Sequence, residues 1–152
     1  KESCHDRLFD QQQWTPKPLN EVFDFFSDVQ NLEELTPPLL NFKVEGKSTE
    51  NIQEGTKIYY KLKIRGIPAK WTSLITNWQP MTEFADVQVK GPYAKWYHRH
   101  LFRTLAGGVL LEDKVVYRLP LSRYGGNLLN WFIRKDIKTI FNYRKNRIKA
   151  WQ

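Results

Sequence analysis

The feature that most constrains the fold is a long stretch, from residue 42 to residue 120, in which apolar and polar residues alternate. The run from 56 to 65 is its clearest part, with four apolar residues on one face: Ile58, Tyr60, Leu62 and Ile64. A period of two predicts a β-strand with one buried and one solvated face. Because Gly- and Pro-containing turn signals separate the successive runs, the stretch predicts an antiparallel meander.

Inward positions can be followed from hairpin to hairpin, since directly opposed residues of antiparallel strands point to the same face. A two-residue turn at Arg65-Gly66 pairs Ile64 with Ile67 and starts the register. The predicted inward residues are then Ala69, Trp71, Ser73 and Ile75; Ala85, Val87 and Val89; Trp96, His98, His100 and Phe102; and Leu111, Asp113, Val115, Tyr117 and Leu119. In this register Asp86 and Gln88 point outward, and Asp113 lies opposite His100. A β-bulge would reverse the parity of every residue after it.

The segments on either side of the meander predict one more strand and three helices. Residues 8–15 form the strand, and Pro18 suits the first turn of a short helix. A second short helix ends at Pro37-Pro38. Residues 127–151 predict one long amphipathic helix, with an apolar arc of roughly 120° that holds Leu129, Ile133, Ile137, Ile140, Phe141, Ile148 and Trp151. This order predicts a single α+β domain over residues 1–152.

The positive charge is concentrated at one end of the chain. The chain has 24 Lys and Arg against 16 Asp and Glu, for a net charge of +8, but residues 122–152 hold eight of the basic residues and only Asp136 as an acid. Arg134, Lys138, Lys145 and Lys149 fall on the solvated flank of the long helix, whose other side is needed by the core. We therefore expect no nucleic-acid partner and at most weak peripheral contact with a membrane.

Other features bound the class of protein. No apolar run approaches the roughly 18 residues of a membrane span. The single cysteine, Cys4, cannot form an internal disulfide, and no Cys/His cluster has the spacing of a structural zinc site. We therefore expect a cytoplasmic protein. Phosphate-binding loops and serine nucleophile elbows are also missing from the sequence.

Several motifs resemble the START-like (SRPBCC) ligand-binding superfamily, in particular its small bacterial polyketide cyclase/dehydrase-like proteins. The match spans nearly the whole chain, and these residues carry it: Pro18-Leu19, Val22 to Asp28, Asn31-Leu32, Leu35 to Pro38, Gly66-Ile67-Pro68 with Trp71, Gly91-Pro92-Tyr93 with Trp96, His98, His100 and Phe102, Asp113 with Tyr117, Leu119 and Pro120, and Phe141 to Arg144. The resemblance implies a helix-grip fold, in which an antiparallel sheet wraps around the long C-terminal helix and leaves a deep apolar cavity between them. It implies no particular ligand.

The candidate reactive residues are His98, His100 and Asp113. The two histidines are two residues apart on one strand, so they share a face, and a carboxylate beside an imidazole fixes its tautomer and raises its basicity. Three interpretations stay open. The residues satisfy one another in the cavity wall; or His98 or His100 transfers a proton in a cyclisation or dehydration; or the three form a two-His, one-carboxylate metal site. We favour the first and predict no metal and no cofactor.

Two arginines fall within the apolar arc of the long helix. Their stems can lie on the core while the guanidinium groups reach solvent, or one of them, Arg144 or Arg147, can pair with Asp113 or with a ligand carboxylate at the cavity mouth. The inward aromatic residues are core packing or cavity lining, two roles that are compatible in this fold. The predicted ligand-binding residues are Tyr60, Trp71, Trp96, His98, His100, Asp113, Tyr117, Phe141 and Arg144.

Two functions from different classes are compatible with these features. The first is a monomeric binding protein that holds a small hydrophobic or amphipathic molecule, lipid-like or aromatic, between the sheet and the C-terminal helix. The alternative is a polyketide cyclase/dehydratase-like enzyme that uses the same cavity, with His98, His100 and Asp113 in acid–base roles.

Overall fold

A computed structural model describes residues 6–119 and 126–151, with residues 126–130 as backbone alone, so that Cys4 and the side chain of Leu129 lie outside the described residues. Within these described ranges, seven strands form one antiparallel sheet in the order β1-β7-β6-β5-β4-β3-β2. Their bounds are β1 Arg7–Thr15, β2 Lys43–Lys47, β3 Lys57–Ile64, β4 Ile67–Gln79, β5 Glu83–Lys90, β6 Lys95–Leu105 and β7 Gly108–Arg118. The predicted antiparallel meander, preceded by one strand, is confirmed.

A two-residue turn sets the register of the hairpin between β3 and β4. Ile64 pairs with Ile67 across Arg65-Gly66, and both turn residues have positive φ, 50° and 81°. This is the conformation of a type I′ turn, whose twist matches that of the strands it joins. In the last hairpin His100 pairs with Asp113, as the sequence predicts.

The predicted orientation of β5 is wrong. Asp86 lies opposite Ile75 of β4 and opposite His98 of β6, so it points inward. The pairing of β4 with β5 shifts between Thr76 and Gln79, where Asn77 has a φ of 51°, and such an irregularity reverses the parity of the residues after it. The sequence predicts Val87 and His98 on the same face, but Val87 pairs with Tyr97. The loop between β5 and β6 therefore shifts the pairing by one residue again, and this second shift restores the predicted parity in β6. The predicted inner face of β6 is therefore right, although that of β5 is not.

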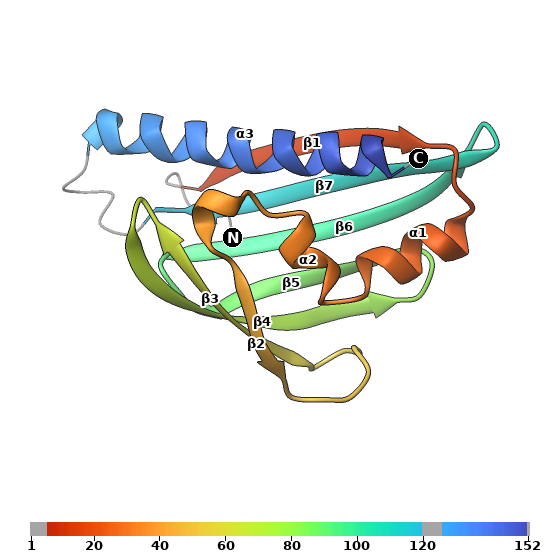
Figure 1. Cartoon of the computed structure of the whole chain (residues 1–152), viewed down its shortest axis with the longest axis horizontal. Coiled ribbons are helices and arrows are strands. Elements are labelled where there is room, and N and C mark those ends of the chain that lie inside the picture. Colours follow the sequence, from red (N-terminus) through yellow and green to blue (C-terminus); the bar gives the residue numbers. More distant parts are fainter. Residues whose placement is uncertain (1–5, 120–125, 152) are drawn as a thin grey trace.

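The helices lie on the concave side of the sheet. They are α1 (Leu19–Phe26), α2 (Asn31–Glu34), the 3-10 helix η1 (Pro38–Leu40) and α3 (Gly126–Ala150). Figure 1 shows α3 running along the β1 and β7 side of the sheet, while β2, β3 and β4 curve away from it, and α1 and α2 occupy the space between. The predicted helix-grip arrangement is confirmed.

The long helix is buried along one side. Ile137, Phe141 and Ile148 are buried, whereas the predicted basic flank of Arg134, Lys138, Lys145 and Lys149 is exposed. Ile137 and Phe141 pack against Val115 and Tyr117 of β7 and against Leu119, which follows that strand. Ile148 packs against a second cluster that includes Val22 of α1 and Phe102 of β6. The amphipathic pattern thus fixes the orientation of α3 about its axis.

Edge strand β1 holds α3 through alternate side chains. The Phe9 ring stacks on that of Phe141 at 4.7 Å. Two positions further along, the Gln11 side-chain amide donates to the carbonyl oxygen of Phe141 at 3.2 Å, and the Gln13 amide donates to that of Lys145 at 2.9 Å. Residues 9, 11 and 13 share one face of the strand, so β1 fixes the helix segment that carries Arg144.

No helix in the described part of the chain is both long enough and apolar enough to span a membrane.

The substitution Ile137→Ala tests the packing of α3. Ile137 is 1% exposed, so its truncation removes buried methyl groups and leaves a cavity, and we expect the free energy of unfolding to fall by about 2–5 kcal/mol. Lys138→Ala on the exposed side should change it by no more than about 0.5 kcal/mol. Urea denaturation of both variants checks this, and equal effects would show that α3 is not packed as described.

Candidate functional site

A cavity of about 320 Å³ lies between the sheet, α2 and α3. Its walls are formed chiefly by apolar and aromatic side chains: Leu32, Leu35, Leu40, Phe42, Tyr60, Leu62, Ile64, Trp71, Tyr93, Trp96, Ile133, Ile140 and Phe141. A smaller polar group also lines it: Thr36, Ser73, Asp86, His98, His100, Asp136 and Arg144. Convergent polar side chains in an apolar cavity are typical of a small-molecule site.

The two histidines of β6 lie face to face. Their ring centroids are 3.7 Å apart with an interplanar angle of 27°. The Phe84 ring of β5 stacks on the other face of His100 at 4.3 Å, because these two residues are directly paired across the strands. The Trp96 ring lies nearly perpendicular to His98, with the ring centroids 6.3 Å apart. Cross-strand pairing therefore builds a column of rings in the cavity wall and leaves the imidazoles little freedom to turn.

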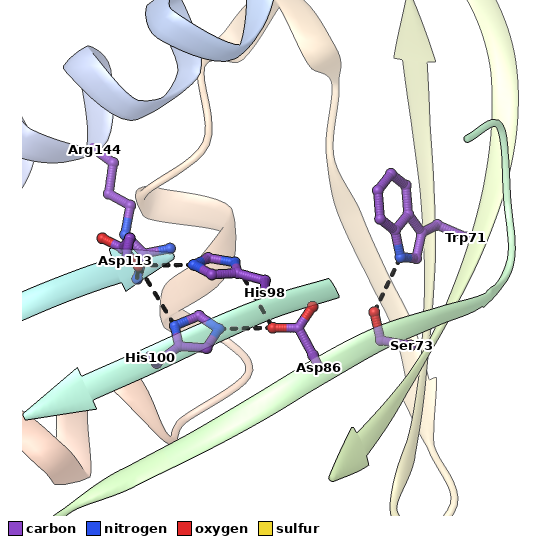
Figure 2. Close-up of polar contacts among 7 residues, drawn as sticks. All are labelled: Trp71, Ser73, Asp86, His98, His100, Asp113 and Arg144. Atoms are coloured by element: carbon purple, nitrogen blue, oxygen red, sulfur yellow. Dashed lines mark hydrogen bonds and ion pairs between the residues drawn. The ribbon is translucent and has the colours of Figure 1, made fainter. Parts of the chain in front are cut away.

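Each histidine is bonded to a different carboxylate. His98 Nε2 lies 2.8 Å from Asp113 Oδ1, and His100 Nε2 lies 2.6 Å from Asp86 Oδ2. The second nitrogen of each ring faces the opposite carboxylate at longer range, 3.8 Å for His98 Nδ1 to Asp86 and 3.7 Å for His100 Nδ1 to Asp113. Figure 2 shows the resulting alternation of imidazoles and carboxylates across β5, β6 and β7.

Arg144 of α3 supplies the positive charge nearest to this cluster. One of its terminal nitrogens lies 3.5 Å from Asp113 Oδ1, and its guanidinium carbon lies 5.1 Å from the centre of the Phe26 ring. The side chain is buried, and both Arg144 Nε and His100 Nδ1 are buried without a hydrogen-bond partner among the described residues. Arg144 thus ties the C-terminal helix to the polar end of the cavity.

Burial and neighbouring charges set the protonation states. Burial alone would raise the pKa of Asp113, but Arg144 and the hydrogen bond from His98 outweigh it and hold the pKa below its usual value. The pKa of Asp86 is also lowered, since the hydrogen bond from His100, together with the neighbouring imidazoles and Arg144, outweighs the effect of burial. Burial lowers the pKa of His100 to about 4, and the neighbouring His98 is the second cause of this shift. Both carboxylates are therefore ionised and His100 is neutral at pH 7.

The structure brings seven of the nine predicted ligand-binding residues to the cavity: Tyr60, Trp71, Trp96, His98, His100, Phe141 and Arg144. Among the described residues, Asp113 and Tyr117 do not line it. Asp113 lies behind the histidines and Tyr117 is buried in the core beside Val115. Arg147 is exposed, which agrees with the solvated alternative for that residue.

Asp86 is the cavity residue that the sequence analysis placed on the wrong face. Its orientation depends on the irregular pairing of β4, which no residue pattern marks clearly. Phe84, two residues earlier, is the signal that could have found it, because a large aromatic side chain favours the inner face of a strand and residues i and i+2 share a face.

Asp86, His98 and His100 together offer donor atoms that all lie within 4.8 Å of one another, so they are candidates for holding a metal ion. An imidazole binds a metal through its in-plane lone pair, at about 2.1 Å. Because the two rings are stacked almost parallel, their lone pairs lie in separate planes and do not converge on one point. One ring would have to rotate out of the column before both could bind one ion. The absence of a metal stays a prediction.

The rim of the cavity is joined by an exposed ion pair. Arg65, at the turn between β3 and β4, donates to both carboxylate oxygens of Asp136 on α3, at 2.9 and 3.2 Å. The guanidinium of Arg65 also lies over the Phe132 ring, with its carbon 4.8 Å from the ring centre. These contacts connect the hairpin to the helix across the rim where Ile64 and Ile133 line the cavity.

Residues 15–142 match a family model described as polyketide cyclase / dehydrase and lipid transport. The chain belongs to this family. The match covers most of the chain, including both histidines, both carboxylates and the residues of α3 up to Phe141 that line the cavity. No curated protein sequence matches the chain.

Solved structures of low sequence identity share the fold. A START superfamily protein from Mycobacterium smegmatis has a TM-score of 0.71 at 9% identity, over 95% of this chain and 99% of that one. The protein TTHA0849 from Thermus thermophilus has 0.70 at 14%, over 96% and 99%. The Zhui aromatase/cyclase from Streptomyces sp. R1128 has 0.69 at 16%, over 95% and 92%. The chain therefore has the START-like fold predicted from its motifs.

The protonation of His100 makes stability depend on pH. The unfolded chain takes up a proton at this residue below its ordinary pKa of 6.5, whereas the folded protein keeps it neutral down to about 4. The free energy of unfolding should therefore fall as the pH drops through this window, by about 1.4 kcal/mol per unit from this residue. Chemical denaturation of wild type and His100→Gln at pH 7 and pH 4.5 checks this.

The variant lacks the titrating group but keeps an amide that can donate to Asp86. Between pH 7 and pH 4.5, we expect the free energy of unfolding of the variant to fall by about 2–3 kcal/mol less than that of wild type. Equal losses in the two proteins would contradict the assignment of a neutral, buried His100.

Proposed function

We propose that the protein binds a small hydrophobic or amphipathic molecule, lipid-like or aromatic, in the cavity between the sheet and α3. The observation that carries the proposal is the cavity itself, about 320 Å³ of space walled chiefly by apolar side chains, with Asp86, His98, His100 and Arg144 among the few polar groups that line it. A single domain that kept such a space only for packing would lose the dispersion contacts of every side chain around it. A ligand restores those contacts.

The relatives support a binding role without naming the molecule. The family description includes lipid transport, and the Streptomyces structure is that of an aromatase/cyclase. Lipid chains and aromatic polyketides share extended apolar surface and a few polar groups. The walls of this cavity, with Trp71, Tyr93 and Trp96 in contact with one another, suit an aromatic body or a bent chain.

We further propose that residues 1–152 act as one domain, in monomeric form and without a cofactor, in the cytoplasm. The single cysteine supports a reducing compartment. The exposed lysines of α3 support at most weak contact with an anionic membrane surface, because the apolar side of that helix is buried against the sheet.

Filling the cavity tests the binding function. Ile140 lines the cavity from α3, so Ile140→Trp places a larger ring in the ligand space. We expect the variant to fold but to bind the neutral dye Nile red at least tenfold more weakly than wild type, and to lose any small molecule that co-purifies with wild type in native mass spectrometry.

Lys138→Trp is the matched control, since residue 138 is on the exposed side of the same helix. It should bind Nile red as wild type does. Unchanged dye binding by a folded Ile140→Trp, together with the absence of any co-purifying molecule in wild type, would count against the proposal.

The alternative function, a polyketide cyclase/dehydratase-like enzyme, has one observation in its favour. His98 and His100 both line the cavity and are both bonded to carboxylates, which would orient them toward a bound substrate. The low pKa of His100 argues against this residue as a general base at pH 7, because effective bases have pKa values near the operating pH. His98, bonded to Asp113, is then the residue that would move a proton.

Substitution of a histidine separates the two functions. Under the binding function, His100→Ala removes a hydrogen bond to Asp86 and should change the affinity for Nile red by less than about tenfold. Under the enzymatic function, a linear polyketide analogue should be cyclised or dehydrated by wild type, and His98→Ala should abolish turnover while it retains binding. Product analysis by mass spectrometry distinguishes these outcomes.

A further inference from the structure

One carboxylate oxygen at the polar end of the cavity has no partner among the described residues. Asp86 uses Oδ2 for its bond to His100 and for its approach to His98. No hydrogen bond from the described part of the chain reaches Oδ1. Figure 2 shows this second oxygen directed away from both imidazoles, and the side chain keeps 19% of its surface accessible while it lines the cavity. A carboxylate oxygen that faces an apolar cavity is poorly hydrated, so this atom favours a ligand group that donates a hydrogen bond.

The other charges at the cavity are already matched. Arg144 has Asp113 beside it, and Asp136 is held by Arg65 at the rim. Among the described residues no Lys or Arg comes within ion-pair distance of Asp86, whose partners are the two histidines. The pKa of Asp86 is lowered, so the group is ionised. The charge that faces the ligand space without a Lys or Arg partner is therefore negative.

Several donors near Asp86 are already paired within the protein. The Trp71 indole N–H donates to Ser73 Oγ at 3.0 Å. His100 donates to Asp86, and Arg144, which lines the cavity, is paired with Asp113 through one terminal nitrogen at 3.5 Å. A ligand with a carboxylate end would meet Asp86 as a like charge, and the guanidinium that lines the cavity, that of Arg144, is already in an ion pair with Asp113.

From this arrangement, and on the basis of the proposed binding function, we infer that the cavity selects ligands whose polar end is a neutral hydroxyl, as in a phenol or an alcohol, and rejects carboxylates. The hydroxyl donates to Asp86 Oδ1, while the apolar body lies against Trp71 and Trp96. A neutral donor fits better than a cation because the surrounding walls are apolar, and a charged end group would lose its hydration there.

A matched series of naphthalenes tests the inference, with displacement of Nile red at pH 7 as the readout. The series is 2-naphthol, which donates; 2-methoxynaphthalene, which accepts only; and 2-naphthoate, which is anionic. Methylation adds apolar surface, so hydrophobicity alone would favour the ether. We expect 2-naphthol to displace the dye at roughly tenfold lower concentration than the ether, because a hydrogen bond to a charged group is involved, and 2-naphthoate to be the weakest.

Asp86→Asn supplies the decisive variant. Its amide oxygen can accept from His100, which leaves an N–H facing the cavity, so the preference for the hydroxyl over the ether should vanish or reverse. Asp24→Asn is the control, because Asp24 is an exposed carboxylate on α1 outside the cavity lining, and it should keep the wild-type preference.

The outcomes separate this inference from the proposed function. If all three naphthalenes displace the dye with equal strength from wild type, or if 2-naphthoate equals 2-naphthol, the selectivity is wrong and the binding function stands. The selectivity is also wrong if folded Asp86→Asn retains the wild-type preference. If none of the three displaces the dye and Ile140→Trp binds it like wild type, both proposals fail. Should Asp86→Asn not fold, the wild-type comparison of hydroxyl, ether and carboxylate decides alone.

Discussion

The packing of α3 into the concave face of the sheet is the interaction on which the rest of the structure depends. The sheet has one solvated face and one apolar face, and the helix supplies the apolar side that covers the latter through Ile137, Phe141 and Ile148. One straight helix cannot fill the whole space inside a curved sheet. The helix lies along β1 and β7, whereas β2, β3 and β4 curve away from it (Figure 1). The cavity occupies the space that the helix leaves, and residues of β3, β4, β5 and β6 line it.

The same contact brings Arg144 to the sheet. Glutamine side chains of β1 donate to carbonyl oxygens of the helix on either side of this residue. These bonds fix where Arg144 lies along the sheet and the direction in which its side chain points. Its guanidinium then stabilises Asp113 as an anion, and Asp113 in turn orients His98. A buried ion pair of this kind adds little net stability. Its effect is to define the arrangement of the polar groups at the end of an otherwise apolar cavity.

Much of this structure can be predicted from the sequence because it depends on periodicity. The alternation over residues 42–120 predicts the meander, the Arg65-Gly66 turn sets its first register, and the apolar arc of the last helix predicts which side is buried. The pairing of His100 with Asp113 comes from the same counting. The orientation of Asp86 does not, since it depends on an irregularity in β4 where a single residue, Asn77, adopts a positive φ. Periodicity also cannot show which partner each imidazole takes, because opposed and diagonal neighbours are both within reach and the packing of the rings decides between them.

The Arg65–Asp136 ion pair is exposed to solvent, whereas the aspartate–histidine contacts at the polar end of the cavity are largely buried. It is exposed on both sides, so it contributes at most about 1 kcal/mol and dissolved salt weakens it further. The aspartates and histidines inside are shielded from solvent and from ions. Dissolved ions therefore screen the contact between hairpin and helix far more than they screen the aspartate–histidine cluster. The polar end of the cavity thus keeps its charge pattern over a range of ionic strengths in which the contact across the rim weakens.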